Sequence, residues 1–173
     1  MLRLFTGIAL PPELKLSLST LGGGLPGARW VDAGNYHITL RFIGEVDEAM
    51  ASDIDEALAR IKAPHFELAL AGLGTFGNRQ LWVGVERNDA LFHLRDKIES
   101  ALVRIGLEPE GRRYQPHVTL ARLKGNDLKL QHFIESNALY RAPPFPVTRF
   151  SLIASHQTKA GSIYEDQADY RLG

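Results

Sequence analysis

The 173-residue chain contains no cysteine, so disulfide bonds, thiol nucleophiles and cysteine-ligated zinc are excluded. It also lacks an excess of either charge, because 20 Lys and Arg balance 20 Asp and Glu. A protein that coats long stretches of duplex normally needs a broad basic face, and this balance argues against one. A few local arginines could still bind a single nucleic-acid end.

The chain has no long hydrophobic run. Its apolar start, residues 2–10, is too short to span a membrane and lacks the layout of a signal peptide. We therefore expect a cytoplasmic location and no membrane partner. Hydrophobic residues make up 45% and charged residues 23%, which is ordinary for a globular protein. At this length we expect residues 1–173 to form a single domain, built as two small lobes that share a core.

One four-residue pattern occurs twice, as His37-Ile38-Thr39-Leu40 and as His117-Val118-Thr119-Leu120. Random placement of the 6 histidines, with the threonines and leucines of this chain, predicts only about 0.035 copies. A single histidine in a strand is usually structural, but two matched copies favour a functional pair.

Each copy lies in a run that reads as a β-strand, in which residues i and i+2 point to the same face. Each therefore presents an imidazole beside a hydroxyl, so a groove that receives both copies holds His37, Thr39, His117 and Thr119. Histidine suits both proton donation and proton acceptance, since its ordinary pKa is about 6.5. The hydroxyls can donate to phosphate oxygens. This set of side chains predicts acid–base chemistry on a phosphate, with no metal required.

Hydrophobic periodicity and turn residues predict an α+β fold, with two pseudo-symmetric lobes that each have a small, mostly antiparallel sheet and covering helices. The groove between the lobes is expected to hold both motifs. Strands are expected at 2–10, 35–43, 66–71, 81–85, 117–121, 145–155 and 162–172. Helices are expected at 11–21, 48–62 (capped by Asp47), 90–105 (capped by Asp89) and 127–136. The remaining segments, including 22–27, 72–80 and 108–115, read as loops.

Two other chemistries use the same residues. Two histidines are too few ligands for a typical zinc site, and Asp32 and Glu45 are out of register with the first motif. A threonine nucleophile is poorly placed, because a threonine two residues from its histidine cannot be deprotonated by it and still attack outward. The other histidines lie in a helix or in polar stretches and are expected to be structural; they are His65, His93, His132 and His156.

The paired motifs resemble those of the two-histidine (2H) phosphoesterase superfamily. The segments 35–46 and 116–122 are similar to those of bacterial and archaeal RNA 2′,3′-cyclic phosphodiesterases, once described as 2′-5′ RNA ligases. Residues 3–11, 81–84 and 150–155 also fit that group, so the resemblance covers nearly the whole chain.

This resemblance implies a bilobal, metal-free and cofactor-free enzyme that opens a 2′,3′-cyclic phosphate at an RNA end to a 2′-phosphomonoester. It implies that His37 is the general acid and His117 the general base, that Arg122 contacts the phosphate and that Phe42 lies beside the base or ribose. Arg122 and Phe42 are each five residues past their histidine, an odd offset that points to the opposite face. A bulge or the strand end must redirect them, or they must reach the site around an edge of the sheet. Arg41, at an even offset, is a phosphate-binding candidate from geometry alone.

The expected partners are RNA termini bearing a cyclic phosphate, and no obligate protein partner is evident. Three alternatives remain open: reversible 2′-5′ ligation of RNA in the same groove, trimming of RNA 3′ ends, and a non-catalytic module that only binds RNA ends. A cyclic-phosphate oligonucleotide and a plain 3′-hydroxyl RNA, offered side by side, separate the enzymatic alternatives. Tight end binding with no product would identify the binding module.

Overall fold

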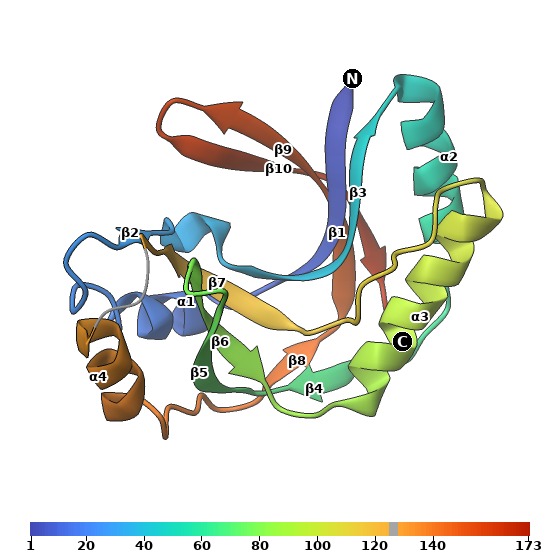
Figure 1. Ribbon diagram of the computed structural model, residues 1–173. Helices are drawn as coiled ribbons and strands as arrows, with labels where there is room; N and C mark the ends of the chain where they lie inside the picture. The colour runs from blue at the N-terminus through green and yellow to red at the C-terminus, as the bar shows by residue number, and fades with distance from the viewer. Residues whose placement is uncertain (125–127) are drawn as a thin grey trace.

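The computed structural model describes residues 1–124 and 128–173 (Figure 1). Its strands are β1 (Leu2–Ala9), β2 (Arg29–Trp30), β3 (His37–Val46), β4 (Phe66–Leu68), β5 (Leu70–Phe76), β6 (Gln80–Val85), β7 (His117–Arg122), β8 (Phe145–Val147), β9 (Arg149–Thr158) and β10 (Gly161–Arg171). Its α-helices are α1 (Pro12–Ser19), α2 (Glu48–Ala59), α3 (Asp89–Arg104) and α4 (Leu128–Ser136). The expected helix start at Asp127 lies outside the described residues.

Two four-stranded sheets carry the two motifs. One sheet has the strand order β10-β9-β1-β3 and the other has the order β2-β7-β6-β5, while β4 and β8 form a small separate pair. The strand pairs of the described residues are antiparallel. The expected α+β fold with one motif on each sheet is confirmed. The lobes are not sequence halves, however, because β9 and β10 return to pair beside β1.

Helices cover these sheets with the stripes that the sequence predicts. The buried face of α3 consists of Leu91, Leu94, Ile98 and Leu102, spaced three or four residues apart. Burying each such side chain contributes about 1.5–3 kcal/mol. In Figure 1, α2 and α3 lie next to each other along one side of the molecule, whereas α1 and α4 lie at the opposite side.

The helix caps follow local chemistry with one correction. The Asp47 carboxylate accepts from the Met50 backbone N–H at 2.8 Å, as expected for the start of α2. At α3 the cap is Asn88 and not Asp89, because the Asn88 Oδ1 accepts from the Leu91 N–H at 3.0 Å. Asp89 instead lies in the first turn, where its negative charge favours the helix N-terminus.

The expected loop over 72–80 was wrong, since β5 runs on to Phe76 and forms a hairpin with β6. The connection spans residues 77–79, and the Arg79 N–H donates to the Phe76 carbonyl oxygen at 2.9 Å. Gly77 and Asn78 are therefore the central residues of this turn, and both have positive φ, 53° and 56°, as a type I′ turn requires. Likewise β3 does not stop at Gly44 but passes through it, because glycine accepts the φ of 94° found there. Glycines that read as strand ends are here the points where strands turn or bend.

Both motif strands contain a β-bulge at the same place. Along β3, the partners of Gly7 and Thr6 are Thr39 and Arg41, so one residue is skipped. Along β7, the partners of Trp82 and Leu81 are Thr119 and Ala121, with the same skip. A bulge moves every later side chain to the other face. It therefore brings the residue five positions past each histidine back to the histidine face.

Candidate active site

The first histidine is held by backbone and aromatic contacts at the start of β3. Its Nδ1 lies 2.6 Å from the Asn35 carbonyl oxygen, which can only accept, so Nδ1 carries the proton. The other nitrogen, Nε2, then accepts from the Thr39 hydroxyl at 3.2 Å. The rings of Phe5 and Tyr164 pack on the imidazole with centroid distances of 4.8 and 5.0 Å. These contacts fix both the tautomer and the ring plane.

The second histidine is held in the same way at the start of β7. The Nδ1 of His117 donates to the Gln115 carbonyl oxygen at 2.7 Å, which leaves its Nε2 as the basic nitrogen. Aromatic rings again flank the imidazole, with centroids at 4.8 Å for Phe76 and 6.1 Å for Trp82. The two motif copies thus present the same nitrogen of two neutral imidazoles.

Burial lowers the pKa of both histidines. The pKa of His37 falls to about 4, chiefly because burial disfavours its charged form, while the hydrogen bond to Asn35 opposes the fall. The positive charges of His117 and Lys15 lower it further. The pKa of His117 is also lowered, mainly by burial. Both shifts favour the neutral imidazole, and a charge on His117 further disfavours protonation of His37.

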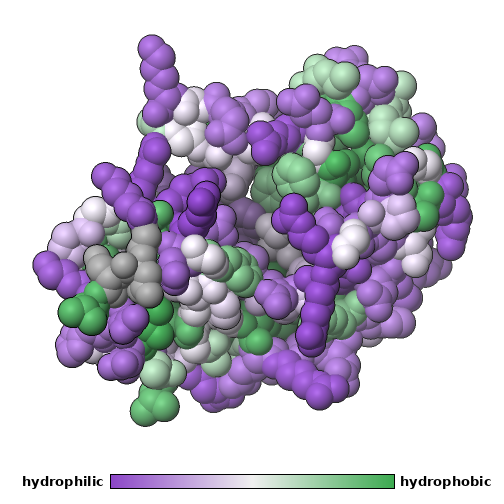
Figure 2. All heavy atoms as spheres, viewed as in Figure 1, coloured by the Kyte–Doolittle hydropathy of each residue, from purple (hydrophilic) through white to green (hydrophobic). Residues whose placement is uncertain are grey.

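A cavity of about 530 Å³ joins the two motifs. Its walls include Thr39 and Phe42 from β3 and His117 from β7, and the hairpin residue Phe76 closes one side. Figure 2 shows the surface hollowed near the centre of this face, between the sheet of β3 and the sheet of β7. Of the four residues expected in the groove, Thr39 and His117 line this cavity, and His37 adjoins it through its contact with the Thr39 hydroxyl, whereas Thr119 is not among the lining residues. A groove that holds all four stays a prediction. The volume of the cavity suits a ligand of nucleotide size, since small-molecule pockets are typically about 300–1,000 Å³.

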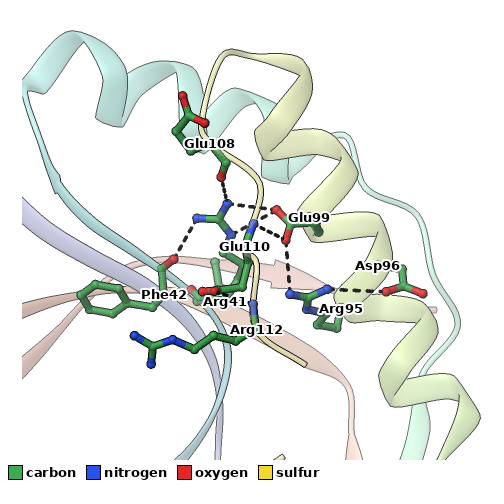
Figure 3. A network of polar contacts seen from close by, with 9 residues as sticks. Arg41, Phe42, Arg95, Asp96, Glu99, Glu108, Glu110 and Arg112 are labelled. Carbon is green, nitrogen blue, oxygen red and sulfur yellow. Dashed lines mark hydrogen bonds and ion pairs between the residues drawn. The ribbon is translucent and has the colours of Figure 1, made fainter. Parts of the chain in front are cut away.

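Arg41 corrects the simple offset argument. The bulge removes its even register with His37, and its side chain is only 6% exposed. Its guanidinium forms an ion pair with Glu99 at 3.0 Å and donates to the Phe42 and Glu108 carbonyl oxygens (Figure 3). Arg41 reaches the cavity wall, but its donors are used to hold α3 and the following loop on β3. A phosphate contact by Arg41 stays a prediction.

The bulges place Phe42 and Arg122, each five residues past a histidine, on the histidine face of their strands. Phe42 is 46% exposed at the cavity, and the Arg3 guanidinium lies 5.6 Å from the centre of its ring. Arg122 is exposed at the end of β7, on the face of His117 and Thr119. The roles of Phe42 as base contact and Arg122 as phosphate contact stay predictions with a geometry that permits them.

Tyr114 is a site residue that the sequence did not reveal. Its hydroxyl donates to the Thr39 carbonyl oxygen at 2.8 Å, so the loop before β7 is tied to β3. The Arg95 guanidinium lies 5.5 Å from the centre of its ring. Burial raises the pKa of Tyr114, so the hydroxyl stays a neutral donor. Nothing in its loop sequence marks it, because the contact depends on how the two sheets meet.

The described residues contain neither a cluster of three metal-ligating side chains nor a helix suited to span a membrane. Within residues 1–124 and 128–173, no three His, Cys, Asp or Glu side chains come close enough to share a metal ion. None of the helices in this part of the chain combines the length and the apolar character needed to cross a bilayer.

This geometry defines a phosphoesterase-like class of site, with two copies of one histidine motif on two sheets around one cavity. The chain belongs to the LigT like Phosphoesterase family, whose sequence pattern matches residues 8–85 and again residues 81–164. Each match contains one histidine motif, so the chain holds an internal repeat.

Named relatives cover most of the chain. It is 39% identical to an RNA 2′,3′-cyclic phosphodiesterase of Aeropyrum pernix over 149 residues, which are 82% of this chain and 84% of the relative. It is 34% identical to an RNA 2′,3′-cyclic phosphodiesterase of Thermotoga maritima, over 95% of this chain and 92% of the relative. Among solved structures, E. coli LigT complexed with 3′-AMP aligns with a TM-score of 0.83 and 27% identity, over 99% of this chain and 98% of that one.

Proposed function

We propose that this protein hydrolyses the 2′,3′-cyclic phosphate at an RNA end to a 2′-phosphomonoester, with His37 and His117 as its acid–base pair. The observation that carries the proposal is one cavity lined by Thr39 of the first motif copy and His117 of the second, with the Nε2 of His37 in contact with the Thr39 hydroxyl. In each copy Nδ1 is bound to a backbone carbonyl oxygen, so Nε2 is the nitrogen that can transfer a proton. The activity named for the Aeropyrum pernix and Thermotoga maritima relatives supports the substrate class.

Bond changes and proton transfers balance within the histidine pair. A water oxygen attacks the phosphorus, and its proton passes to His117 as general base. The bond between phosphorus and the ribose 3′-oxygen breaks, and His37 donates its proton to that leaving oxygen. The threonine hydroxyls of the two motifs, with Arg122, are assigned to the non-bridging oxygens, where charge develops. The step leaves His117 protonated and His37 neutral, so His117 must release its proton to solvent and His37 must take one up before the next turnover.

The assignment of His37 as acid and His117 as base follows from the resemblance to the family. Burial lowers the pKa of His37 to about 4, so this residue is neutral near pH 7. A bound phosphate is an anion, and an anion beside an imidazole raises its pKa. The proposal therefore requires that the substrate itself completes the protonation of the acid.

The activity is tested with a cyclic-phosphate oligonucleotide and a 3′-hydroxyl RNA of the same sequence. We expect cleavage of the cyclic phosphate only, retained in excess chelator, and a loss of at least about 10²-fold in turnover in His37→Ala and in His117→Ala. His132→Ala, on α4 and away from the cavity, is the matched control. Near-normal hydrolysis by either cavity variant, or loss in chelator with rescue by metal, would reject the mechanism.

A substrate with sulfur at the 3′-bridging position tests the direction. A thiolate leaves without protonation far more readily than an alkoxide, because thiols have a pKa near ~8.5. This substrate should restore much of the rate of His37→Ala and little of the rate of His117→Ala. The opposite pattern of rescue would exchange the two roles.

The whole chain, residues 1–173, is proposed to act as one bilobal domain in the cytoplasm, with RNA termini as its partners. Supporting this, Tyr114 ties the loop before β7 to β3, and the cavity has walls from both sheets. Thermal unfolding should show one transition, and a second resolved transition would separate the lobes. Cell fractionation tests the location.

A further inference from the structure

Arginine is unusually concentrated at one cavity wall. In a chain with a formal net charge of zero, the cavity that holds His117 is lined by one acidic residue and five arginines, which are Arg41, Arg79, Arg95, Arg112 and Arg113. Among the described residues, no lysine lines it. Proton transfer by two histidines does not need so many cations, so the excess calls for a separate role.

The five arginines fall into two groups. Arg41 and Arg95 are mostly buried and both bind the Glu99 carboxylate, at 3.0 and 3.2 Å. By contrast Arg79, Arg112 and Arg113 are exposed, and none of them forms an ion pair with any residue in the described ranges 1–124 and 128–173. The first group is neutralised by the fold, whereas the second keeps its charge available.

The backbone that carries the exposed group is well fixed. Glu99 accepts from the Glu110 N–H at 3.1 Å, and the Glu110 carboxylate accepts from the Arg112 N–H at 3.1 Å. Figure 3 shows the Arg112 side chain extending from this loop with no drawn partner for its guanidinium. On the facing hairpin, the Arg79 carbonyl oxygen accepts from the Leu123 N–H at 2.7 Å. Ordered backbones thus hold these arginines around the cavity at low entropic cost.

A cyclic phosphate occupies the 3′ end of its strand, so every other phosphate of that strand lies on its 5′ side. Arginine binds phosphate through paired N–H donors and is the residue of choice for this contact. We propose that Arg79, Arg112 and Arg113 form a subsite for the backbone phosphates 5′ of the reacting end. This inference rests on the proposed function and adds that the enzyme prefers a strand over a cyclic mononucleotide.

The test compares a nucleoside 2′,3′-cyclic phosphate, which has no other phosphate, with a tetranucleotide that ends in the same group. Wild-type protein should favour the tetranucleotide in kcat/KM, and the triple variant Arg79→Gln/Arg112→Gln/Arg113→Gln should reduce this preference at least tenfold, mainly through KM. In the variant, the logarithm of kcat/KM for the tetranucleotide should fall less steeply with the logarithm of salt concentration, by about 0.7 for each phosphate that an arginine no longer neutralises. Arg171→Gln, exposed at the end of β10, is the matched control.

An unchanged preference and an unchanged salt slope in the triple variant would overturn the subsite. A second result would also overturn it: ATP inhibits wild-type protein but not the triple variant, while the triple variant keeps its preference for the tetranucleotide. The arginines would then bind a free nucleotide polyphosphate and not the RNA strand. If wild-type protein cleaves neither substrate, the proposed function fails on its own. The subsite is then tested by fluorescence anisotropy with a 3′-phosphorylated tetranucleotide, where the triple variant must still lose affinity and salt slope.

Discussion

The two motif strands, β3 and β7, share a backbone pattern but differ in two side chains. In β3 and in β7 the first six residues share the same order of burial. The histidine at the first position and the threonine at the third are partly exposed, the second, fourth and fifth positions are buried, and the sixth is exposed. Both strands bulge after the threonine. At the fifth position, however, β3 has the buried Arg41 and β7 has the buried Ala121. At the sixth, β3 has Phe42 where β7 has Arg122.

This difference shows how a repeated motif acquires two functions without a change in backbone. In the proposed mechanism the shared positions supply the proton-transfer pair. The two variable positions carry a buried arginine that anchors α3, an exposed aromatic ring and an exposed cation. Duplicated strands can therefore keep chemistry constant while substrate contacts diverge. Substitutions at the fifth and sixth positions, and at the histidines, should therefore have different effects in the two strands.

The largest effect is expected at the fifth position. Arg41→Met leaves the partly buried Glu99 with Arg95 as its sole ion-pair partner among the described residues and should reduce the free energy of unfolding by about 3 kcal/mol. The equivalent change on the other strand, Ala121→Gly, should cost only about 1 kcal/mol. Urea unfolding measures both. Equal losses of unfolding free energy in the two variants would show that Arg41 and Ala121 contribute equally to stability.

The two histidines should differ in how acid affects stability. The unfolded chain binds a proton at each histidine near pH 6.5, whereas in the folded protein burial lowers the pKa of His37 to about 4. The folded state therefore binds fewer protons between these values, and stability falls as the pH falls through this window, by about 3 kcal/mol from His37 alone. His37→Gln should flatten this fall more than His117→Gln in unfolding curves between pH 7 and pH 4. The reverse order would contradict the deeper burial of His37.

The sixth position should separate phosphate binding from base contact. Arg122→Gln should reduce kcat/KM about tenfold on all cyclic substrates, since it removes a cation assigned to the phosphate. Phe42→Leu should raise KM about threefold and should affect purine and pyrimidine ends differently, because a flat ring stacks on bases. Steady-state kinetics on four cyclic mononucleotides measures both changes. A base-dependent defect in Arg122→Gln would reverse the assignments.

A smaller effect is expected at the bridge between the strands. Tyr114→Phe removes the hydrogen bond to the Thr39 carbonyl oxygen, a change of about 1 kcal/mol. If this bond positions the two motifs, kcat should fall severalfold with little change in KM, and the rate profile against pH should shift. Tyr140→Phe, whose hydroxyl contacts Ser17 at 3.4 Å outside the cavity, is the control. Equal kcat in both variants would leave Tyr114 with a purely structural role.

The sequence predicts those parts of the site that depend on local geometry. Alternation along a strand is local, so it places His37 and Thr39 on one face, and likewise His117 and Thr119. Cap chemistry at Asp47 is equally local, and that prediction is confirmed. The overall fold follows from hydrophobic periodicity in the same way.

Features that depend on register and tertiary packing were not predictable. The bulges arise from pairing with β1 and β6, and they moved Arg41 off the face that a regular strand would give it. The contacts of Glu99 and Tyr114 join segments that are distant in sequence. The hairpin turn at Gly77 and Asn78 read as a loop because positive φ is not visible in a glycine-rich segment.

The central claim is that two imidazoles act on one phosphorus from two copies of one motif. Phosphorus NMR of a cyclic-phosphate dinucleotide tests it most directly, in wild-type protein and in the His37→Ala and His117→Ala variants. We predict that wild-type protein converts the cyclic resonance into a single monoester coupled to the ribose H2′, and that both variants leave the cyclic resonance unchanged over the same time. Conversion by either variant at close to the wild-type rate would contradict the account.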